Sequence, residues 1–145
     1  MLDKLDEALR LRRVVHSGRL RLEGEESRNT LTEADNYAMN LLDLQRFEEA
    51  NALLRKVMPV ARRVLGDNNE TTLHMRWTYA KTLCGATGAT LEDLREAVAT
   101  LEDVERTARR VLGSAHPYTK GIERAVKFSR KKLRARETPP PPGDA

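Results

Sequence analysis

Apolar residues recur along much of this chain at alternating spacings of three and four, which is the period of an amphipathic α-helix. One stripe of six apolar residues begins at Phe47 and a second begins at Leu94, and the spacings within the two are identical. The stripes consist of Phe47, Ala50, Leu54, Val57, Ala61 and Val64, and of Leu94, Ala97, Leu101, Val104, Ala108 and Val111. This agreement predicts two equivalent helices, each of which buries one face.

Turn and capping residues set the boundaries of the remaining helices. Gly66 and Gly113 follow the two striped helices and predict left-handed C-terminal caps. Thr90, with Asp93 three residues later, predicts an N-terminal cap. Pro117 suits a first helical turn, where no amide donor is needed. Further helices are expected at about 2–23, 27–43, 70–86 and 117–136.

The chain also repeats itself. The segment 62–66 returns 47 residues later at 109–113, and the Tyr-Ala pair at 37–38 returns 42 residues later at 79–80. The five extra residues of the longer offset fit the glycine-containing segment 85–90. A repeat of about 42 residues with helical periodicity predicts an all-α fold, a short right-handed superhelical solenoid of antiparallel helix pairs.

Composition narrows the class of protein. Hydrophobic residues make up 39% and aromatic residues 4% of the 145 residues, so the core must be thin and aliphatic. Cys84 is the only cysteine, which excludes an internal disulfide. No apolar run approaches the roughly 20 residues that cross a bilayer, and the acidic N-terminal segment does not resemble a secretory signal. We therefore expect a soluble cytoplasmic protein, either one domain or a part of a longer array.

The net charge of +4 is concentrated near the C-terminus. Between residues 116 and 136 there are eight Lys or Arg residues and one acid, so the first 115 residues are close to neutral. Five of these cations recur at spacings of four and three and form a basic stripe on one helix face: Lys120, Arg124, Lys127, Lys131 and Arg134. Such a stripe suits phosphates or an anionic surface, or it keeps the end of a helical stack soluble.

Three segments are expected from these patterns. Residues 1–25 predict an N-terminal partial repeat or capping helix, because Arg12 and Arg19 stand where the stripes have apolar residues. Residues 26–136 predict the helical repeats, which end in a basic cap helix. Residues 137–145 contain four consecutive prolines and predict a disordered tail.

These features resemble the tetratricopeptide-repeat family, and more closely its kinesin-light-chain-like repeat type. The matching marks are Arg46-Phe47-Glu48-Glu49-Ala50 followed by Leu53-Leu54, Asn36-Tyr37-Ala38, and the junction Leu112-Gly113-Ser114-Ala115-His116-Pro117. The resemblance covers about residues 5–136, which is nearly the entire chain. It implies a scaffold for protein–protein interaction and not an enzyme.

The resemblance also implies that the first helices of the pairs line a concave groove for a peptide. Carried onto this chain, the groove consists of Asn36, Met39, Asp43, His74, Trp77, Thr78, Lys81, Arg124 and Phe128. Asn36 can hydrogen-bond a peptide backbone, while Lys81 and Arg124 can pair with carboxylates, so an acidic segment is expected. Trp77 either offers an apolar plate to a ligand or fills the gap between adjacent pairs, and packing is favoured.

No arrangement typical of catalysis or metal binding is found in the sequence. His16, His74 and His116 are scattered, and no two of them stand at metal-ligand spacing. His116 is expected to cap a helix, and Cys84 aligns with Leu42 and is expected to be a core residue. We therefore expect no catalytic residue, no metal site and no cofactor.

Two alternatives to the peptide groove stay open. The basic stripe could bind nucleic acid or an anionic surface, although few aromatic residues lie among its cations, which makes nucleic acid the less favoured partner. The altered first helix could instead pack on another copy, so that the chain self-associates through its terminal helices.

Overall fold

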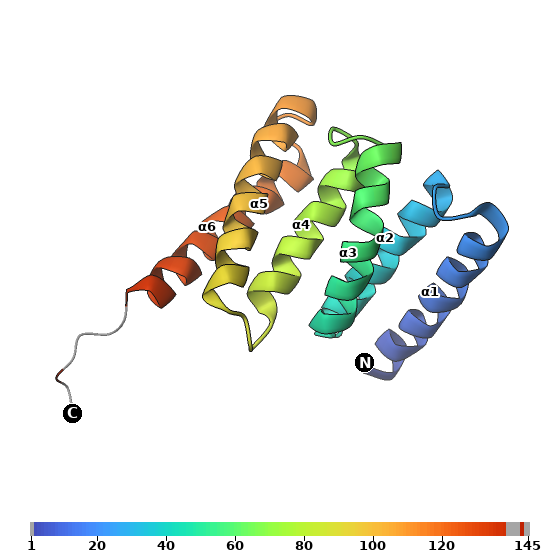
Figure 1. The fold of residues 1–145 in the computed structure, drawn as a ribbon, viewed down its shortest axis with the longest axis horizontal. Helices are drawn as coiled ribbons and strands as arrows, with labels where there is room; N and C mark the ends of the chain where they lie inside the picture. The colour runs from blue at the N-terminus through green and yellow to red at the C-terminus, as the bar shows by residue number, and fades with distance from the viewer. Residues whose placement is uncertain (1, 139–142, 144–145) are drawn as a thin grey trace.

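The computed structural model describes residues 2–138 and 143, and within them it contains six helices and no strand (Figure 1). The helices are α1 (Leu2–Glu23), α2 (Arg28–Asp43), α3 (Phe47–Val64), α4 (Glu70–Gly85), α5 (Leu91–Val111) and α6 (Pro117–Glu137). The expected bounds of α1, α2, α4 and α6 agree with these to within one residue, and the all-α prediction is confirmed. The proline-rich tail expected at 137–145 lies mostly outside the described residues.

Each helix packs against the next one along the chain, which produces a stack of antiparallel helix pairs (Figure 1). In addition, α4 contacts both α2 and α6, so these three helices form a continuous layer. Within the described part of the chain, α3 and α5 make no contact with each other. On one face of the stack, α2, α4 and α6 therefore pack side by side. On the other face, α3 and α5 are separated by a gap.

The two apolar stripes supply much of the core, but Phe47 and Val57 are only partly buried and the last member of each stripe is exposed. The buried members are Ala50, Leu54, Ala61, Leu94, Ala97, Leu101, Val104 and Ala108. Val64 and Val111, which the stripes predict to be buried, are 41% and 40% exposed. The prediction is wrong for these two because α3 and α5 end there, and the next residues, Leu65 and Leu112, pack against the core instead.

The helix ends follow the capping residues of the sequence. Gly66 and Gly113 have φ values of +89° and +90°, which is the left-handed conformation that glycine adopts at low cost. Thr90 and Asp93 form a reciprocal capping box at the start of α5. The His116 side chain accepts a hydrogen bond from the backbone N–H of Tyr118 and caps α6. These local predictions are confirmed.

The five extra residues of the second repeat are divided between a loop and a helix. The loop 86–90 is longer by two residues than the loop 44–46, and α5 has 21 residues where α3 has 18. The expectation that all five lie in segment 85–90 is therefore wrong in part. The capping box at Thr90 allows α5 to begin at Leu91, three residues before the position that corresponds to Phe47.

The first helix, α1, packs on α2 alone. Its buried Leu9 joins Leu41 and Ala50 in a small cluster. Arg12 reaches Glu33 of α2 at 3.4 Å, and Arg19 pairs with a glutamate of its own helix. Burial along α1 is therefore slight, and the assignment of residues 1–25 to a partial repeat stays a prediction.

Candidate protein-interaction surface

All nine residues predicted for the groove lie on the layer formed by α2, α4 and α6. Asn36, Met39 and Asp43 are on α2, His74, Trp77, Thr78 and Lys81 are on α4, and Arg124 and Phe128 are on α6. Thr78 is buried, whereas Asp43, Arg124 and Phe128 are exposed and the remaining residues are partly buried. The structure brings the α4 and α6 residues together around two features, an aromatic cluster and an apolar hollow.

The aromatic cluster consists of His74 and Trp77 of α4 and Tyr118 of α6. The ring centroids lie 5.6 Å apart for His74 and Trp77, 5.0 Å for His74 and Tyr118, and 5.9 Å for Trp77 and Tyr118. The Lys81 ammonium lies 4.1 Å from the centroid of the Trp77 ring, a cation–π contact. Burial lowers the pKa of Lys81, and the nearby Asp43 carboxylate opposes that shift.

Trp77 fills the space between α4 and α6. Its indole lies over Gly121, where a Cβ atom would be 2.5 Å from the ring. The indole N–H is buried and has no hydrogen-bond partner among the described residues. This geometry agrees with the packing interpretation of Trp77, because the ring is held by helix α6 and the neighbouring side chains.

A largely buried contact between Asp35 and His74 joins α2 to α4. The Asp35 carboxylate oxygens lie 2.9 Å and 2.8 Å from His74 Nδ1, and the two side chains are only 11% and 13% exposed. Thr78 donates a hydrogen bond to the His74 carbonyl at 2.9 Å, and its hydroxyl also lies 3.3 Å from the Met39 sulfur. These contacts fix the His74 ring and the register between the two helices.

The apolar hollow lies between α4 and α6 and has a volume of about 330 Å³. Its lining consists of Ala80, Lys81, Cys84, Gly85, Leu101, Arg124, Ala125 and Phe128. Phe128 is 61% exposed, whereas the other aromatic side chains are buried or partly buried. Three of the predicted groove residues, Lys81, Arg124 and Phe128, thus line one recess, whose exposed surface is almost wholly apolar.

The basic stripe of α6 is exposed along its whole length. None of its five residues forms an ion pair within the described part of the chain. Other cations of α6 hold the helix in place: Arg130 pairs with Glu102 at 3.0 Å, Arg136 donates to the Ala89 carbonyl, and Lys132 donates to the Cys84 carbonyl. The cations of α6 thus fall into two groups: three that contact other parts of the chain, and the five of the basic stripe, which face outward.

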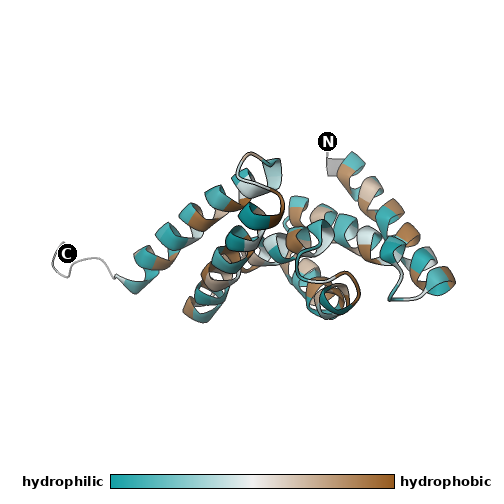
Figure 2. Cartoon of the chain, turned by 90° about the horizontal axis from the view of Figure 1, so that it is seen from above, coloured by the Kyte–Doolittle hydropathy of each residue, from teal (hydrophilic) through white to brown (hydrophobic). Residues whose placement is uncertain are grey.

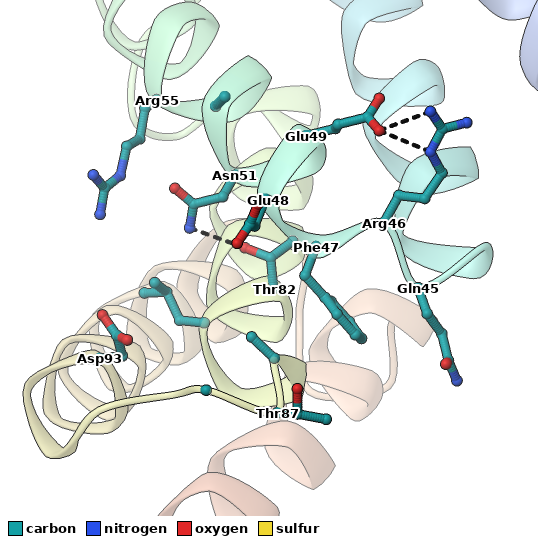
Figure 3. Close-up of a pocket in the computed structure, with 14 residues that line it drawn as sticks. Gln45, Arg46, Phe47, Glu48, Glu49, Asn51, Arg55, Thr82, Thr87 and Asp93 are labelled. Atoms are coloured by element: carbon teal, nitrogen blue, oxygen red, sulfur yellow. Dashed lines mark hydrogen bonds and ion pairs between the residues drawn. The ribbon is translucent and has the colours of Figure 1, made fainter.

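A larger cavity, which the sequence did not predict, lies on the opposite side of the stack between α3 and α5 (Figure 3). It has a volume of about 720 Å³ and includes Phe47, whose ring lies 2.7 Å from the position of a Cβ on Gly85. Arg46 pairs with Glu49 at 2.7 Å on one rim, and Asn51 donates to the Thr82 hydroxyl at 3.4 Å on the floor. The sequence signal that could have predicted this cavity was the longer offset of the second repeat. Ala86, Thr87 and Gly88, in the longer loop of that repeat, form part of the cavity wall.

Two polar contacts from α4 to α5 close the floor between α3 and α5. The Tyr79 hydroxyl donates to Glu96 at 2.8 Å, and burial raises the pKa of this phenol. Arg76 lies 2.8 Å from an Asp103 carboxylate oxygen, and this hydrogen bond lowers the pKa of Asp103. The lining of the larger cavity contains charges of both signs, with Arg46 and Arg55 beside Glu48, Glu49 and Asp93.

Within the described residues, no helix has both the length and the hydropathy needed to span a bilayer. The same residues include no group of three or more His, Cys, Asp or Glu side chains placed to hold a metal ion. His16 lies against Tyr37 of α2, whereas His74 and His116 both lie against Tyr118 of α6. Burial lowers the pKa of His16.

The comparisons with known proteins identify the repeat. Residues 30–70 match the family model of the tetratricopeptide repeat. This range covers nearly all of α2, the whole of α3 and the turn that leads into α4, so the matched unit is one complete helix pair. No curated protein matches the chain.

Proposed function

This chain is a tetratricopeptide-repeat protein, and from that premise we propose that it binds an acidic peptide segment of a partner protein across α2, α4 and α6. Repeats of this family are scaffolds for protein–protein interaction. The layer of α2, α4 and α6 is continuous, whereas α3 and α5 stand apart. A continuous layer offers an extended segment an unbroken row of side chains.

The observation that carries the proposal is that the side chains of two basic residues, Lys81 and Arg124, line one apolar hollow. Two cations beside apolar walls favour a ligand that presents a carboxylate next to an apolar side chain. Of the acids of the same face, Asp35 is buried against His74 and is therefore not presented to a ligand. Asp43 is exposed and close enough to Lys81 to influence its charge, so it limits how many carboxylates the site accepts.

A displayed library of random peptides, panned against the full chain, tests the proposal. We expect the enriched peptides to combine acidic and apolar residues. Replacing Lys81 and Arg124 together by Gln should weaken a synthetic enriched peptide by at least about tenfold, since two charge pairs are lost. Enrichment without acidic residues, or affinity unchanged in the double variant, would contradict the proposal.

The matched control replaces Lys127 and Lys131 by Gln. It removes the same charge from the basic stripe without touching the hollow. We expect the control to bind the peptide with an affinity within about twofold of the unmodified chain, because screening by salt reduces the influence of distant exposed charges. Circular dichroism of both double variants should show unchanged helicity.

The exposure of the whole basic stripe supports a second candidate, electrostatic binding to nucleic acid or an anionic surface. Such binding releases counterions and falls steeply with salt. A double-stranded DNA oligonucleotide and phosphatidylserine vesicles are suitable probes. Loss of more than about tenfold in affinity between 50 and 200 mM salt, abolished by the Lys127 and Lys131 substitutions, would favour this candidate over the peptide groove.

A further inference from the structure

The outward face of α1 carries most of the exposed large apolar side chains of the described residues. Leu11, Val14 and Leu22 are 62%, 68% and 81% exposed, and Val15 is 41% exposed. α1 packs only on α2, through the side that contains Leu9. In Figure 2, hydrophobic and hydrophilic segments alternate along the helix at the N-terminal end of the stack, which is the opposite end from α6. A soluble monomer seldom leaves such a continuous apolar surface uncovered.

The spacing of this face is that of a coiled-coil seam. Ala8, Leu11, Val15, Gly18 and Leu22 follow one another at spacings of three, four, three and four. Lys4 continues the same line toward the N-terminus. No atom lies within 4 Å of the position that a Cβ on Gly18 would take, so the seam is open at this residue. We propose that two copies of this chain pair through their α1 helices in an antiparallel coiled coil.

The antiparallel direction follows from what each seam position would meet. With the two-fold axis near residue 13, Leu11 lies opposite Val15 of the second copy and Ala8 lies opposite Gly18. Lys4 lies opposite Leu22, where its aliphatic stem covers the leucine while its ammonium reaches water. A parallel pair would instead place Lys4 against Lys4 and Gly18 against Gly18, which repels at one layer and leaves a void at the other.

Charges beside the seam complement one another in the same arrangement. The first turns of α1 contain Asp3, Asp6 and Glu7, whereas the later turns contain Arg10, Arg13 and Arg21. Glu7 and Arg21 flank the seam on the same side, so an antiparallel partner sets Glu7 beside Arg21 twice. Within the described residues neither side chain has an ion-pair partner in its own chain. Val14 lies on that side too, on the two-fold axis, which accounts for an exposed valine.

The other end of the stack does not offer an equivalent surface. The outward face of α6 carries the five cations of the basic stripe, all exposed. An α1 seam placed on α6 would bury charges against leucine and valine, which is unfavourable. Pairing through α1 alone produces a closed dimer and not a filament.

Sedimentation of the full chain over a range of concentrations tests the proposal. We expect a reversible monomer–dimer equilibrium and no larger species. Leu11→Glu should weaken the dimer by more than tenfold, because it buries two charges near the centre of the seam. Phe128→Glu is the matched control, since Phe128 is equally exposed on α6 and should leave the equilibrium unchanged. Both variants should keep their helicity by circular dichroism.

A charge swap tests the direction and does not depend on the apolar variant. Glu7→Arg and Arg21→Glu should each weaken the dimer several-fold, and the two together should restore it. A monomer at every concentration, a species that grows beyond the dimer, or a dimer that Leu11→Glu leaves intact would overturn the proposal. Failure of the swap to restore the dimer would overturn the antiparallel direction. Peptide binding on α4 and α6 is measured separately, so the two proposals fail independently.

Discussion

Trp77 of α4 lies directly over Gly121 of α6, with its Cη2 atom 2.5 Å from the position that a Cβ on residue 121 would occupy. Gly121 is in the interior of α6 and fulfils no turn requirement there. The indole belongs to a cluster with His74 and Tyr118, so it is not free to move aside. The close approach of the two helices at this point therefore depends on the missing side chain.

Gly121→Ala should lower stability. In an open helix interior the same change stabilises by about 1 kcal/mol, but here overpacking costs about 1–3 kcal/mol. We expect a net loss of up to about 2 kcal/mol in urea unfolding, together with a red shift of the tryptophan emission as the indole moves toward water.

The control for this prediction is Gly18→Ala. No atom lies within 4 Å of the added Cβ, so the helix propensity of alanine should prevail. At a dilution where the chain is monomeric, a gain of up to about 1 kcal/mol is expected. A gain for both alanine variants would show that the Trp77 packing is not tight.

The contact between Asp35 and His74 should contribute to the register of α2 on α4. Asp35→Ala removes both acceptor oxygens beside a ring that is only 13% exposed, and should cost about 1–3 kcal/mol. Asp35→Asn keeps one acceptor and should cost clearly less in the same urea unfolding measurement. Asp43→Ala, on the exposed side of α2, should change stability by less than about 0.5 kcal/mol. Equal losses for Asn and Ala at residue 35 would contradict this account.

The fold could be predicted from the sequence because its signals are local. The stripes from Phe47 and Leu94, and the caps at Gly66 and Gly113, depend on residues within one or two helical turns. Val64 and Val111 were the exceptions: their spacing fits the stripes, but their exposure depends on where α3 and α5 end relative to their neighbours.

The site was less accessible to prediction, because it depends on the register between helices far apart in the chain. His74 and Trp77 were identified on α4, but their contact with Tyr118 depends on how α6 slides along α4. Gly121 carries no periodic signal at all. The cleft between α3 and α5 was not predicted because it exists where these two helices do not pack on each other. The pattern of residues along the chain does not show which helices stay apart.

The capping box at the start of α5 should be worth a measurable part of the stability. Thr90→Ala leaves the backbone N–H of Asp93 without its acceptor and should cost about 1 kcal/mol. Thr87→Ala, in the exposed part of the same loop, should be close to neutral. The two losses from Thr90→Ala and Asp93→Ala should add up to more than the loss in the double variant, since each half of the box depends on the other. Strict additivity in urea unfolding would argue against a reciprocal box.

The Cys84 thiol should be protected from reagents until the chain unfolds. It is buried, and burial raises its pKa above the ordinary value, which lowers the thiolate fraction at pH 8. The nearby Lys132 ammonium opposes this shift but does not reverse it. Reaction with a disulfide reagent at pH 8 should therefore be at least about tenfold slower in buffer than in urea. Rapid labelling of the folded chain would contradict the burial.

The same shift determines how stability depends on pH. Because the folded pKa of Cys84 lies above the unfolded value of 9.0, the unfolded chain loses this proton first as pH rises. The contribution to stability is complete below pH 9 and is lost as pH rises through the folded pKa. Tyr79 and Tyr118, whose pKa values are also raised by burial, act in the same direction at higher pH. Cys84→Ala should remove the contribution of Cys84 to this pH dependence and leave that of the two tyrosines. Between pH 8 and pH 10 the free energy of unfolding should therefore fall less in the variant than in the unmodified chain, whatever its value at pH 8. An identical decline in both chains would mean that the thiol has the same pKa in the folded and unfolded states.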